Sequence, residues 1–322
     1  MTSPHVTEPA RPLLAICAQI PGNELITAEC QNLTGGAPSL ERAAVCQSLD
    51  LVPRAAYIQT GLRLLASGRN LPELVQAMAQ AQHQAPFAAD DFRIEFLRLA
   101  QENPIHKMEA ILAAAEALNV YPNLKHPAHR FLVVAHRGGL WFGEILAECQ
   151  HSYQQHDAKP YRTSASLPAR LARALVNLVA PPAGTLLDPF CGTSSILLEA
   201  CALGLEAYGL DHNPKMVGMS RRNLAHFGYT AQVKRGRAEA CSQPADAIVT
   251  DLPYGRFLQR DPAGLLPAFS RLVHLAPQAI YLAEGDLSAQ LFEAGYCKVE
   301  VLHVRKRAAM SRCVHIAHTT AL

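Results

Sequence analysis

Short apolar runs alternate with amphipathic segments through residues 166–322, and this rhythm leaves few folds open. Strands that are separated by crossover helices pair in parallel, because a tight turn joins only antiparallel neighbours. The predicted strands read "GTLLDPF", "EAYGLD", "AQVKRG", "DAIVTD" and "AIYLAE", with two more strand-like runs at 297–304 and 311–319. The predicted helices span 167–179, 193–203, 213–226, 265–274 and 286–294. We therefore expect an α/β domain whose seven-stranded sheet is mixed but mostly parallel, with helices on both faces.

Residues 1–150 follow a less regular pattern of strands and helices. The first part reads as a strand over 13–20, a helix that Asn23 caps and Gly35-Gly36 stop, a strand at "RAAVCQSL", and helical periodicity over 54–66 and 71–82. After the break "QHQAPFAADD" come a strand "FRIEFLRL", a helix "PIHKMEAILAAAEALN" and a hairpin from "RFLVVAH" to "LWFGEILAE". We expect two α+β domains at 1–85 and 86–150, a polar linker at 151–165, and the α/β domain at 166–322.

The composition is that of an ordered protein and excludes several classes. Of the 322 residues, 49% are hydrophobic and 17% are charged, which predicts a sizeable core. Nine cysteines without a C-x-x-C spacing argue against a zinc site or a disulfide framework, so no metal is expected and a cytoplasmic protein fits best. No apolar run approaches 18 residues and no signal peptide is visible, so we expect no membrane association.

The charge is unevenly divided between the two halves of the chain. Residues 1–159 contain 12 Lys/Arg and 15 Asp/Glu, whereas residues 160–322 contain 17 and 12. A basic excess in the second half is typical of a protein that binds an anionic partner. A solvated surface explains an excess of this size equally well.

Three predicted strands of the last domain end in an acid. Asp188 is followed by a small-residue turn at 192–195, Asp211 by "HNP", and Asp251 by "LPY". In open α/β sheets, ligands bind at the carboxyl ends of the strands, and an acid placed like Asp211 commonly accepts hydrogen bonds from ribose hydroxyls. Two of these acids also have a simpler interpretation: Asp211 or Asn213 caps the next helix, and Asp251 ends a strand before an ordinary turn.

The turn after Asp251 has a chemistry of its own. An exocyclic amine of a nucleobase is a poor nucleophile, because its lone pair is delocalised into the ring. The Asp251 carboxylate and the Leu252 carbonyl can accept its two N–H hydrogens, Pro253 restricts the backbone between them, and Tyr254 offers a face on which a flipped base can stack. We therefore name Asp251, Leu252, Pro253 and Tyr254 as catalytic candidates.

The motifs "ASLPARLARALVNLV", "LLDPFCGTSSILLEA", "GLDHNPKMVGMSRRNLAHFG" and "DAIVTDLPYGR" together resemble the THUMP-domain tRNA guanine-N2 methyltransferases. The resemblance is clearest over 160–260. It implies a Rossmann-like methyltransferase domain that uses S-adenosylmethionine, a ferredoxin-like N-terminal domain, and a THUMP-like RNA-binding domain at 86–150. The implied cofactor contacts are Ser166, Asp188, Phe190, Cys191, Gly192, Thr193, Asp211, His212 and Glu239. Ser166 also has a structural interpretation, as the N-cap of the helix that follows.

The chain departs from the family pattern at three places. Leu252 stands where the family usually has a proline, and Ser194-Ser195 replace a pair of glycines. Arg237 occupies the place of an acid that usually reads the adenine amine, and either Glu239 or a backbone carbonyl can take over that role.

The resemblance makes tRNA the expected partner and a guanosine N2 amine, at position 10 or nearby in the acceptor stem, the expected target. Candidate RNA contacts are Arg137, Arg256, Arg305, Lys306 and Arg307, since Lys and Arg bind phosphates without regard to sequence. A monomer is expected, with a small activating protein as a further candidate partner. Two alternatives stay open: methylation of ribosomal RNA guanine or of an adenine N6 amine, and a non-catalytic RNA-binding protein that keeps the fold.

Overall fold

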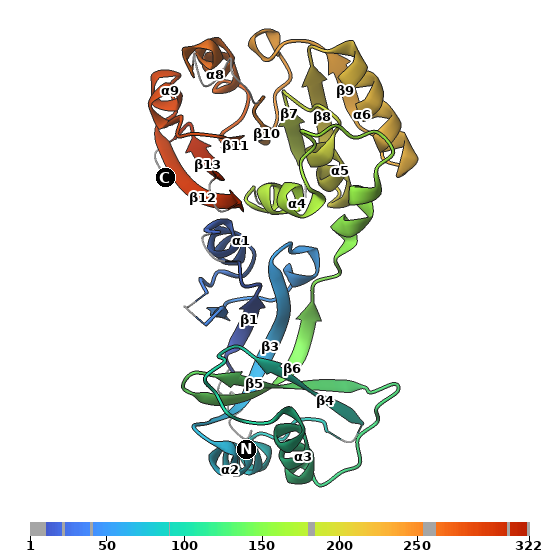
Figure 1. The fold of residues 1–322 in the computed structure, drawn as a ribbon, viewed down its shortest axis with the longest axis vertical. Helices are drawn as coiled ribbons and strands as arrows, with labels where there is room; N and C mark the ends of the chain where they lie inside the picture. The colour runs from blue at the N-terminus through green and yellow to red at the C-terminus, as the bar shows by residue number, and fades with distance from the viewer. Residues whose placement is uncertain are drawn as a thin grey trace, which may run out of the picture. The chain divides into compact units, whose positions relative to one another are not determined.

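The computed structural model describes residues 11–20, 23–38, 41–89, 91–179, 184–253, 262–307 and 310–320. The chain forms two compact units (Figure 1). The N-terminal unit comprises Met1–Gln19, Leu33–Pro53 and Ile58–Cys149, and the C-terminal unit comprises Ile20–Asn32, Arg54–Tyr57 and Gln150–Leu322. Two short N-terminal segments thus belong to the C-terminal unit.

The N-terminal unit is built on a sheet of six strands within its described residues, in the order β2-β1-β3-β6-β5-β4. The strands are β1 (Leu13–Cys17), β2 (Ala43–Cys46), β3 (Ile58–Gly68), β4 (Phe92–Arg98), β5 (His129–His136) and β6 (Gly139–Glu148). Only the pair β4–β5 is parallel among these described strands. Because β3 pairs with both β1 and β6, strands from 1–85 and 86–150 share one sheet. The division into ferredoxin-like and THUMP-like domains stays a prediction.

The helical periodicity predicted for 54–66 is wrong, because most of this stretch is β3. Its burial repeats every four residues instead of every two. The register of β3 against β6 shifts between Gly61 and Leu62 and again between Leu64 and Ala66. Each irregularity places an extra residue in one strand and interrupts the alternation of inward and outward side chains, so the apolar pattern imitates that of a helix.

Helices α2 (Leu71–Gln84) and α3 (Lys107–Leu118) pack on each other and cover this sheet. Asn70 caps α2 by accepting a hydrogen bond from the Glu73 amide at 3.0 Å. The buried faces of both helices meet strand residues such as Phe131 and Phe142, whose rings stack at 5.1 Å. The helices expected at these places are confirmed.

The C-terminal unit contains the expected seven-stranded sheet within its described residues, in the order β12-β13-β11-β10-β7-β8-β9. Its strands are β7 (Thr185–Asp188), β8 (Glu206–Asp211), β9 (Gln232–Arg235), β10 (Ala247–Asp251), β11 (Gln278–Ala283), β12 (Lys298–Arg307) and β13 (Met310–His318). The five strands from β9 to β11 are mutually parallel, and β13 and β12 close the sheet in antiparallel fashion. The predicted mixed, mostly parallel sheet is confirmed.

The helices of this unit form two groups. Helices α4 (Ala169–Asn177), α5 (Ser195–Ala202) and α6 (Pro214–His226) pack in sequence, and α8 (Leu266–Leu272) packs on α9 (Ser288–Glu293). Helix α1 (Leu25–Thr34) and the short 3-10 helices η1 (Val52–Arg54), η2 (Ser152–Ala158), η3 (Ala238–Ala240) and η4 (Pro262–Leu265) complete the described elements. No helix in the described part of the chain is long and apolar enough to cross a membrane.

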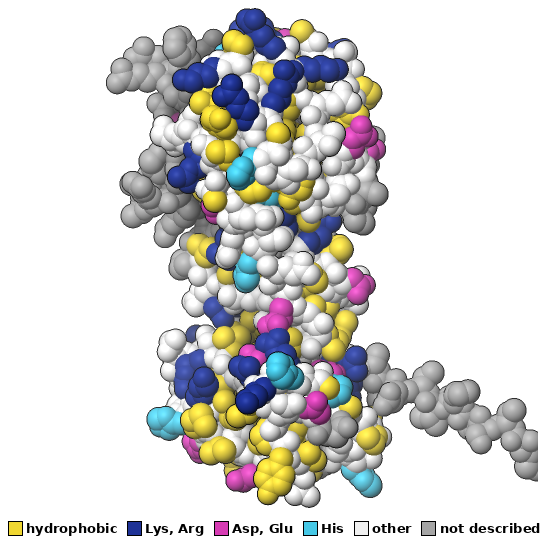
Figure 2. Space-filling view, turned by 90° about the vertical axis from the view of Figure 1, so that its right-hand side faces the viewer, with side chains coloured by type: hydrophobic (Ala, Val, Ile, Leu, Met, Phe, Trp, Pro, Cys, Tyr) yellow, Lys and Arg dark blue, Asp and Glu magenta, His cyan; other side chains and the backbone are white. Residues whose placement is uncertain are grey.

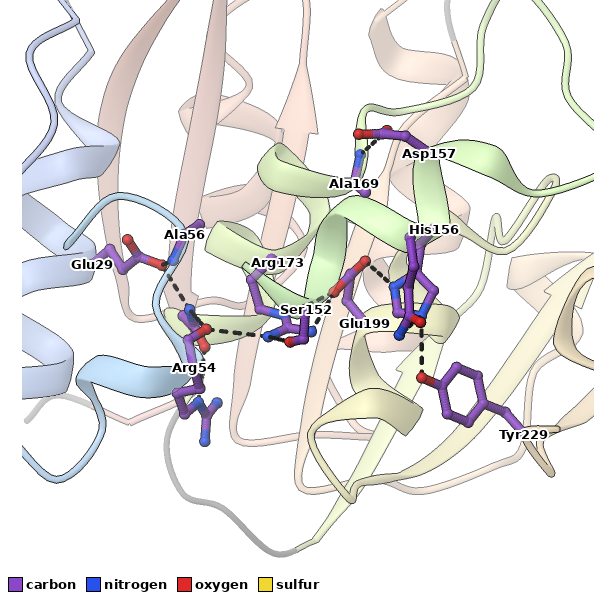
Figure 3. A network of polar contacts seen from close by, with 12 residues as sticks. Glu29, Arg54, Ala56, Ser152, His156, Asp157, Ala169, Arg173, Glu199 and Tyr229 are labelled. Carbon is purple, nitrogen blue, oxygen red and sulfur yellow. Dashed lines mark hydrogen bonds and ion pairs between the residues drawn. The ribbon is translucent and has the colours of Figure 1, made fainter. Parts of the chain in front are cut away.

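A buried polar network ties η2, α4 and α5 together (Figure 3). The Glu199 carboxylate of α5 is fully buried and accepts a hydrogen bond from Arg173 Nε at 2.7 Å. Its other oxygen lies 2.6 Å from His156 Nδ1, and His156 Nε2 lies 3.1 Å from the Tyr229 hydroxyl. Because buried charges are stable only when paired and hydrogen-bonded, these contacts fix the position of α5.

A second buried carboxylate, Glu29 of α1, belongs to the same unit. It accepts hydrogen bonds from the amides of Ala56 and Tyr57 at 2.8 and 2.7 Å and from Asn177 Nδ2 at 2.6 Å. Burial raises the pKa of Glu29 above its ordinary value, and the three donors oppose this rise. The segment 54–57 is thereby attached to α4.

Candidate active site

A cavity of about 990 Å³ lies at the carboxyl ends of β7, β8 and β10. Its lining residues are Thr163, Ala165, Ser166, Leu167, Asp188, Pro189, Phe190, Cys191, Gly192, Thr193, Ser195, Ile196, Asp211, His212, Met216, Gly236, Arg237, Ala238, Glu239, Asp251, Leu252, Pro253, Gly264 and Leu265. The cavity therefore brings together all the predicted cofactor contacts with Asp251, Leu252 and Pro253. Tyr254 lies outside the described residues.

Asp188 ends β7 and is almost completely buried at the cavity wall. Its Oδ1 accepts hydrogen bonds from Thr250 Oγ1 at 2.6 Å and from the Phe190 amide at 3.2 Å. Burial, with a smaller contribution from the negative charges of Asp251 and Asp211, raises the pKa of Asp188 to about 7 against the effect of the two donors. In the ligand-free protein, ionisation of this carboxyl group is disfavoured, and a nearby positive charge would favour it.

The loop after Asp188 turns through two residues with left-handed backbone conformations. Gly192 has a φ of +50° and Ser194 a φ of +67°. Glycine adopts this region freely, whereas a serine there costs roughly 1 kcal/mol. The replacement of a glycine by Ser194 is thus accommodated with some strain, which its hydroxyl offsets by donating to the Thr193 carbonyl at 2.6 Å.

The segment before α4 holds this loop from the other side. Ser166 Oγ lies 3.0 Å from Thr193 Oγ1, and Asn223 Nδ2 donates to the Thr193 carbonyl at 2.9 Å. The interpretation of Ser166 as a helix cap is wrong: α4 begins at Ala169, with Pro168 at the cap position. Lys159 adds a hydrogen bond to Ser195 Oγ, and burial lowers the pKa of its ammonium group to about 8.

Asp211 ends β8 with both carboxylate oxygens engaged. Oδ2 accepts from the Gly192 amide at 3.1 Å and Oδ1 from the Asn213 amide at 2.8 Å. Asn213 itself caps α6 through its hydrogen bond from the Lys215 amide. The structural interpretation therefore holds for Asn213. Each oxygen of Asp211 has a further lone pair, which leaves the carboxylate able to accept hydrogen bonds from a ligand.

The far end of the cavity is formed by residues after β8 and β9. Arg237 and Glu239 are both exposed, and Arg237 Nε lies 4.0 Å from Glu239 Oε2. His212 is exposed, with Nδ1 3.7 Å from Asp211 Oδ1. Arg237 and Glu239 thus both line the cavity. Glu239 is the acid expected to substitute for the one that the family usually has at position 237.

Asp251 ends β10 and is half-buried beside the turn. The Leu252 side chain packs into the core beneath the turn, and its amide donates to the Leu282 carbonyl at 3.0 Å. Because this side chain is buried in the core, only the Leu252 backbone is available to the cavity. An apolar residue can therefore replace the family's usual proline without changing what the turn presents to a ligand.

Arg312 of β13 is a residue that sequence reasoning missed. Its guanidinium is buried, and Nη1 lies 3.7 Å from Asp251 Oδ1. An adjacent positive charge favours the ionised form of a carboxyl group. The available signal was a single arginine between apolar and small residues in the predicted strand at 311–319, but nothing in the sequence joined it to Asp251, 61 residues earlier.

Of the predicted RNA contacts, Arg137 alone has a described side chain, and it does not line the cavity. Arg137 is exposed in the β5–β6 turn, with Nη2 3.6 Å from Glu102 Oε1. Arg305, Lys306 and Arg307 lie in β12 by their backbone, and their side chains are outside the described residues, as is Arg256. Among the described residues, no group of His, Cys, Asp and Glu could hold a metal ion.

Comparisons with known proteins point to one family. Residues 156–276 match the model of a family described as UPF0020, RMKL-like, methyltransferase domain. Two proteins named tRNA (guanine(10)-N2)-dimethyltransferase match parts of the chain. The one from Methanothermobacter thermautotrophicus is 44% identical over 101 residues, 30% of each chain. The one from Methanocaldococcus jannaschii is 27% identical over 287 residues, 74% of this chain and 79% of that protein.

The match to a third such protein, from Pyrococcus abyssi, is 36% identical and spans 36% of this chain and 38% of that one. The chain thus spans about a third of the length of the first and third of these relatives. TrmN from Thermus thermophilus shares the fold, with a TM-score of 0.53, 21% identity, and coverage of 96% of this chain and 100% of that one. The three curated relatives confirm the resemblance to the THUMP-domain tRNA guanine-N2 methyltransferases, and residues 156–276 match a methyltransferase domain model.

Proposed function

We propose that this protein methylates the exocyclic N2 amine of a guanosine in tRNA, at position 10 or nearby in the acceptor stem, with S-adenosylmethionine as the methyl donor. The observation that carries the proposal is the meeting of Asp188, Asp211 and Asp251 at one cavity, next to a turn that contains Pro253. The names of the matched relatives support guanosine N2 and tRNA as the target.

The acids of the cavity suit the positive charges of the donor. S-adenosylmethionine supplies an electrophilic methyl group on a sulfonium, and it also carries an ammonium group. Asp188 is a buried acid whose raised pKa falls when a cation approaches, so its position favours the methionine part of the donor. Asp211 would accept hydrogen bonds from ribose hydroxyls, and Glu239 from the adenine amine.

The turn after β10 would hold the target amine. Asp251 and the Leu252 carbonyl are both acceptors, so they can bind the two N–H hydrogens of one amine and direct its lone pair away from the ring. Pro253 restricts the backbone of the residue before it, which keeps the Leu252 carbonyl out of a helical hydrogen bond. Asp251 does not need to be a strong base, because an alkylated amine loses its proton readily.

Arg312 would act on the amine through Asp251. A buried guanidinium 3.7 Å from the carboxylate would favour the ionised, hydrogen-bond-accepting form of Asp251 as the base enters and excludes water. We assign Arg312 as a positioning residue. Its replacement by methionine should lower kcat and move the acidic limb of the pH–rate profile upward, whereas a purely structural role would leave that limb in place.

The test is methylation of defined RNAs. The protein is incubated with methyl-labelled S-adenosylmethionine and unmodified tRNA transcripts, and the labelled nucleoside is identified by mass spectrometry. We expect N2-methylguanosine or N2,N2-dimethylguanosine. Absence of either from every tRNA contradicts the proposal.

Two other functions give different results in the same experiment. Label in ribosomal RNA guanine, or in N6-methyladenosine, would assign the same chemistry to another target. Equilibrium dialysis that detects tRNA binding but no S-adenosylmethionine binding would identify a non-catalytic RNA-binding protein, the alternative to which the Arg237 departure points.

A further inference from the structure

The basic excess of the second half of the chain is concentrated in one segment. Residues 212–238 contain six Lys/Arg and no Asp or Glu. Outside this segment, residues 160–322 contain 11 Lys/Arg and 12 Asp/Glu. A mixed surface carries both signs interspersed, because like charges that are crowded together repel. The segment is therefore purely basic, whereas the rest of residues 160–322 has nearly equal numbers of basic and acidic residues.

Five of these six cations lie on α6 and β9, and Arg237 lies two residues after β9. They are all exposed: Lys215, Arg221, Arg222, Lys234, Arg235 and Arg237. Helix α6 packs on β9, which is one edge of the seven-stranded sheet. Figure 2 looks onto the side of the C-terminal unit that bears these elements and shows Lys and Arg side chains gathered at its top. We call this surface the α6–β9 patch.

Three arginines of the patch are held by neutral groups, so their charge is not neutralised. Arg221 donates through Nε and Nη2 to the Val233 carbonyl at 3.0 and 2.6 Å. Arg235 Nε donates to the His212 carbonyl at 3.3 Å, and the Arg222 guanidinium lies 5.3 Å from the centre of the Tyr161 ring. In the described part of the chain, Arg237 is the one member with a carboxylate within 4.0 Å.

The patch continues into the wall of the cavity. His212, Met216, Gly236 and Arg237 line the cavity and belong to the segments that carry the patch. We propose that the α6–β9 patch binds the phosphate backbone of the RNA whose base enters the cavity. The inference rests on the proposed function in taking RNA as the substrate, and it places a part of the RNA on the cofactor side of the site.

Phosphate recognition explains the patch better than protection of a sheet edge does. Exposed lysines on an edge strand prevent pairing with other chains, which would account for Lys234 and Arg235 of β9. Edge protection would not account for the cations of α6, because a helix has no unpaired strand edge with which another chain could pair. Fixed guanidinium groups suit phosphate oxygens, because their donors are already oriented.

The sheet offers a matched control at its other edge. Lys234 on β9 and Lys298 on β12 are both exposed lysines on the two opposite edge strands of one sheet. Lys234→Glu and Lys298→Glu therefore make the same change in net charge, and only the first lies in the patch. Circular dichroism and thermal midpoints check that both variants are folded.

The experiment measures the Kd for a tRNA transcript over a range of salt concentrations. We expect Lys234→Glu to weaken binding roughly tenfold at low salt and to reduce the slope of log K against log salt by about 1. Lys298→Glu should leave both near the wild-type values. The Kd for S-adenosylmethionine should not change in either variant, and the loss in methylation should appear in KM for tRNA more than in kcat.

Several results would overturn the inference. Equal weakening by Lys234→Glu and Lys298→Glu would show an effect of net charge alone, and no weakening by Lys234→Glu would show that RNA does not touch the patch. If Lys234→Glu instead abolishes binding of a purified acidic protein while tRNA binding is intact, the surface serves a protein partner. RNA binding that depends on the patch without any methylation would refute the proposed function and leave this inference standing.

Discussion

Two groups of buried carboxylates in the C-terminal unit have opposite electrostatic designs. Glu199 is paired with Arg173 and lies beside His156, so its charge is balanced inside the fold (Figure 3). Asp188 faces a cavity and has two further acids, Asp211 and Asp251, as electrostatic neighbours. The charge of Glu199 is thus balanced within the fold, whereas the Asp188 carboxyl group would gain its counter-charge from a positively charged ligand. The surroundings of a buried carboxylate in this unit thus distinguish a structural role from a role in ligand binding.

The largest expected effect comes from the acid at the amine turn. Asp251→Asn keeps the shape of the side chain and removes its charge and one acceptor, so methyl transfer should fall roughly 10²–10⁴-fold. Cofactor affinity should stay near that of the wild type, although the thermal midpoint should fall because Asp251 is the carboxylate beside the buried Arg312 guanidinium. Single-turnover assays and equilibrium dialysis measure the two quantities. A variant that transfers methyl groups at the wild-type rate contradicts the role of Asp251.

The same change at Glu199 should act on stability instead. Glu199→Gln leaves the Arg173 guanidinium buried without its carboxylate, which costs about 3–5 kcal/mol in the free energy of unfolding. The exposed Glu293→Gln in α9 is the control, with an expected change within about 0.5 kcal/mol. Urea denaturation measures both. Equal stabilities of the two variants would mean that the Glu199 network contributes nothing beyond a surface charge.

These two sites also show how far sequence reasoning reaches. The order of strands and helices in 166–322 and the three acids at strand ends were predictable, because apolar periodicity and turn residues are local properties. The pairing of Arg312 with Asp251 and of Asn177 with Glu29 was not, since each joins residues brought together only by the fold. β3 was missed because its irregular register imitates a helix, and the cap assigned to Ser166 was wrong because the helix begins three residues later.

A third prediction concerns pH and uses Asp188. Its pKa rises from an ordinary value near 3.8 to about 7 in the folded protein, so the folded state binds this proton more tightly than the unfolded state. Stability of the ligand-free protein should therefore fall as the pH rises from about 4 to about 7. Compared with Asp188→Asn, the wild type should lose up to about 1.4 kcal/mol per pH unit in that window. Parallel stability curves for the two proteins would contradict the raised pKa.

The smallest expected effect is at the strained loop residue. Ser194→Gly removes the cost of a left-handed serine but loses the hydroxyl contact and gains freedom in the unfolded chain. The net change in the free energy of unfolding should stay within about 1 kcal/mol, with cofactor affinity unchanged. A larger loss of stability would mean that the Ser194 hydroxyl, more than the backbone, holds the loop.

The most direct measurement is calorimetric titration of the protein with S-adenosylmethionine at pH 7 in two buffers with different ionisation enthalpies. If the acids at the cavity await a cation, binding lowers the pKa of Asp188 from about 7 and releases a fraction of a proton, so the observed enthalpies differ between buffers. Asp188→Asn should abolish the difference. Equal enthalpies for the wild type in both buffers, or a proton release that persists in Asp188→Asn, would contradict the assignment of this cavity as a site for a cationic cofactor.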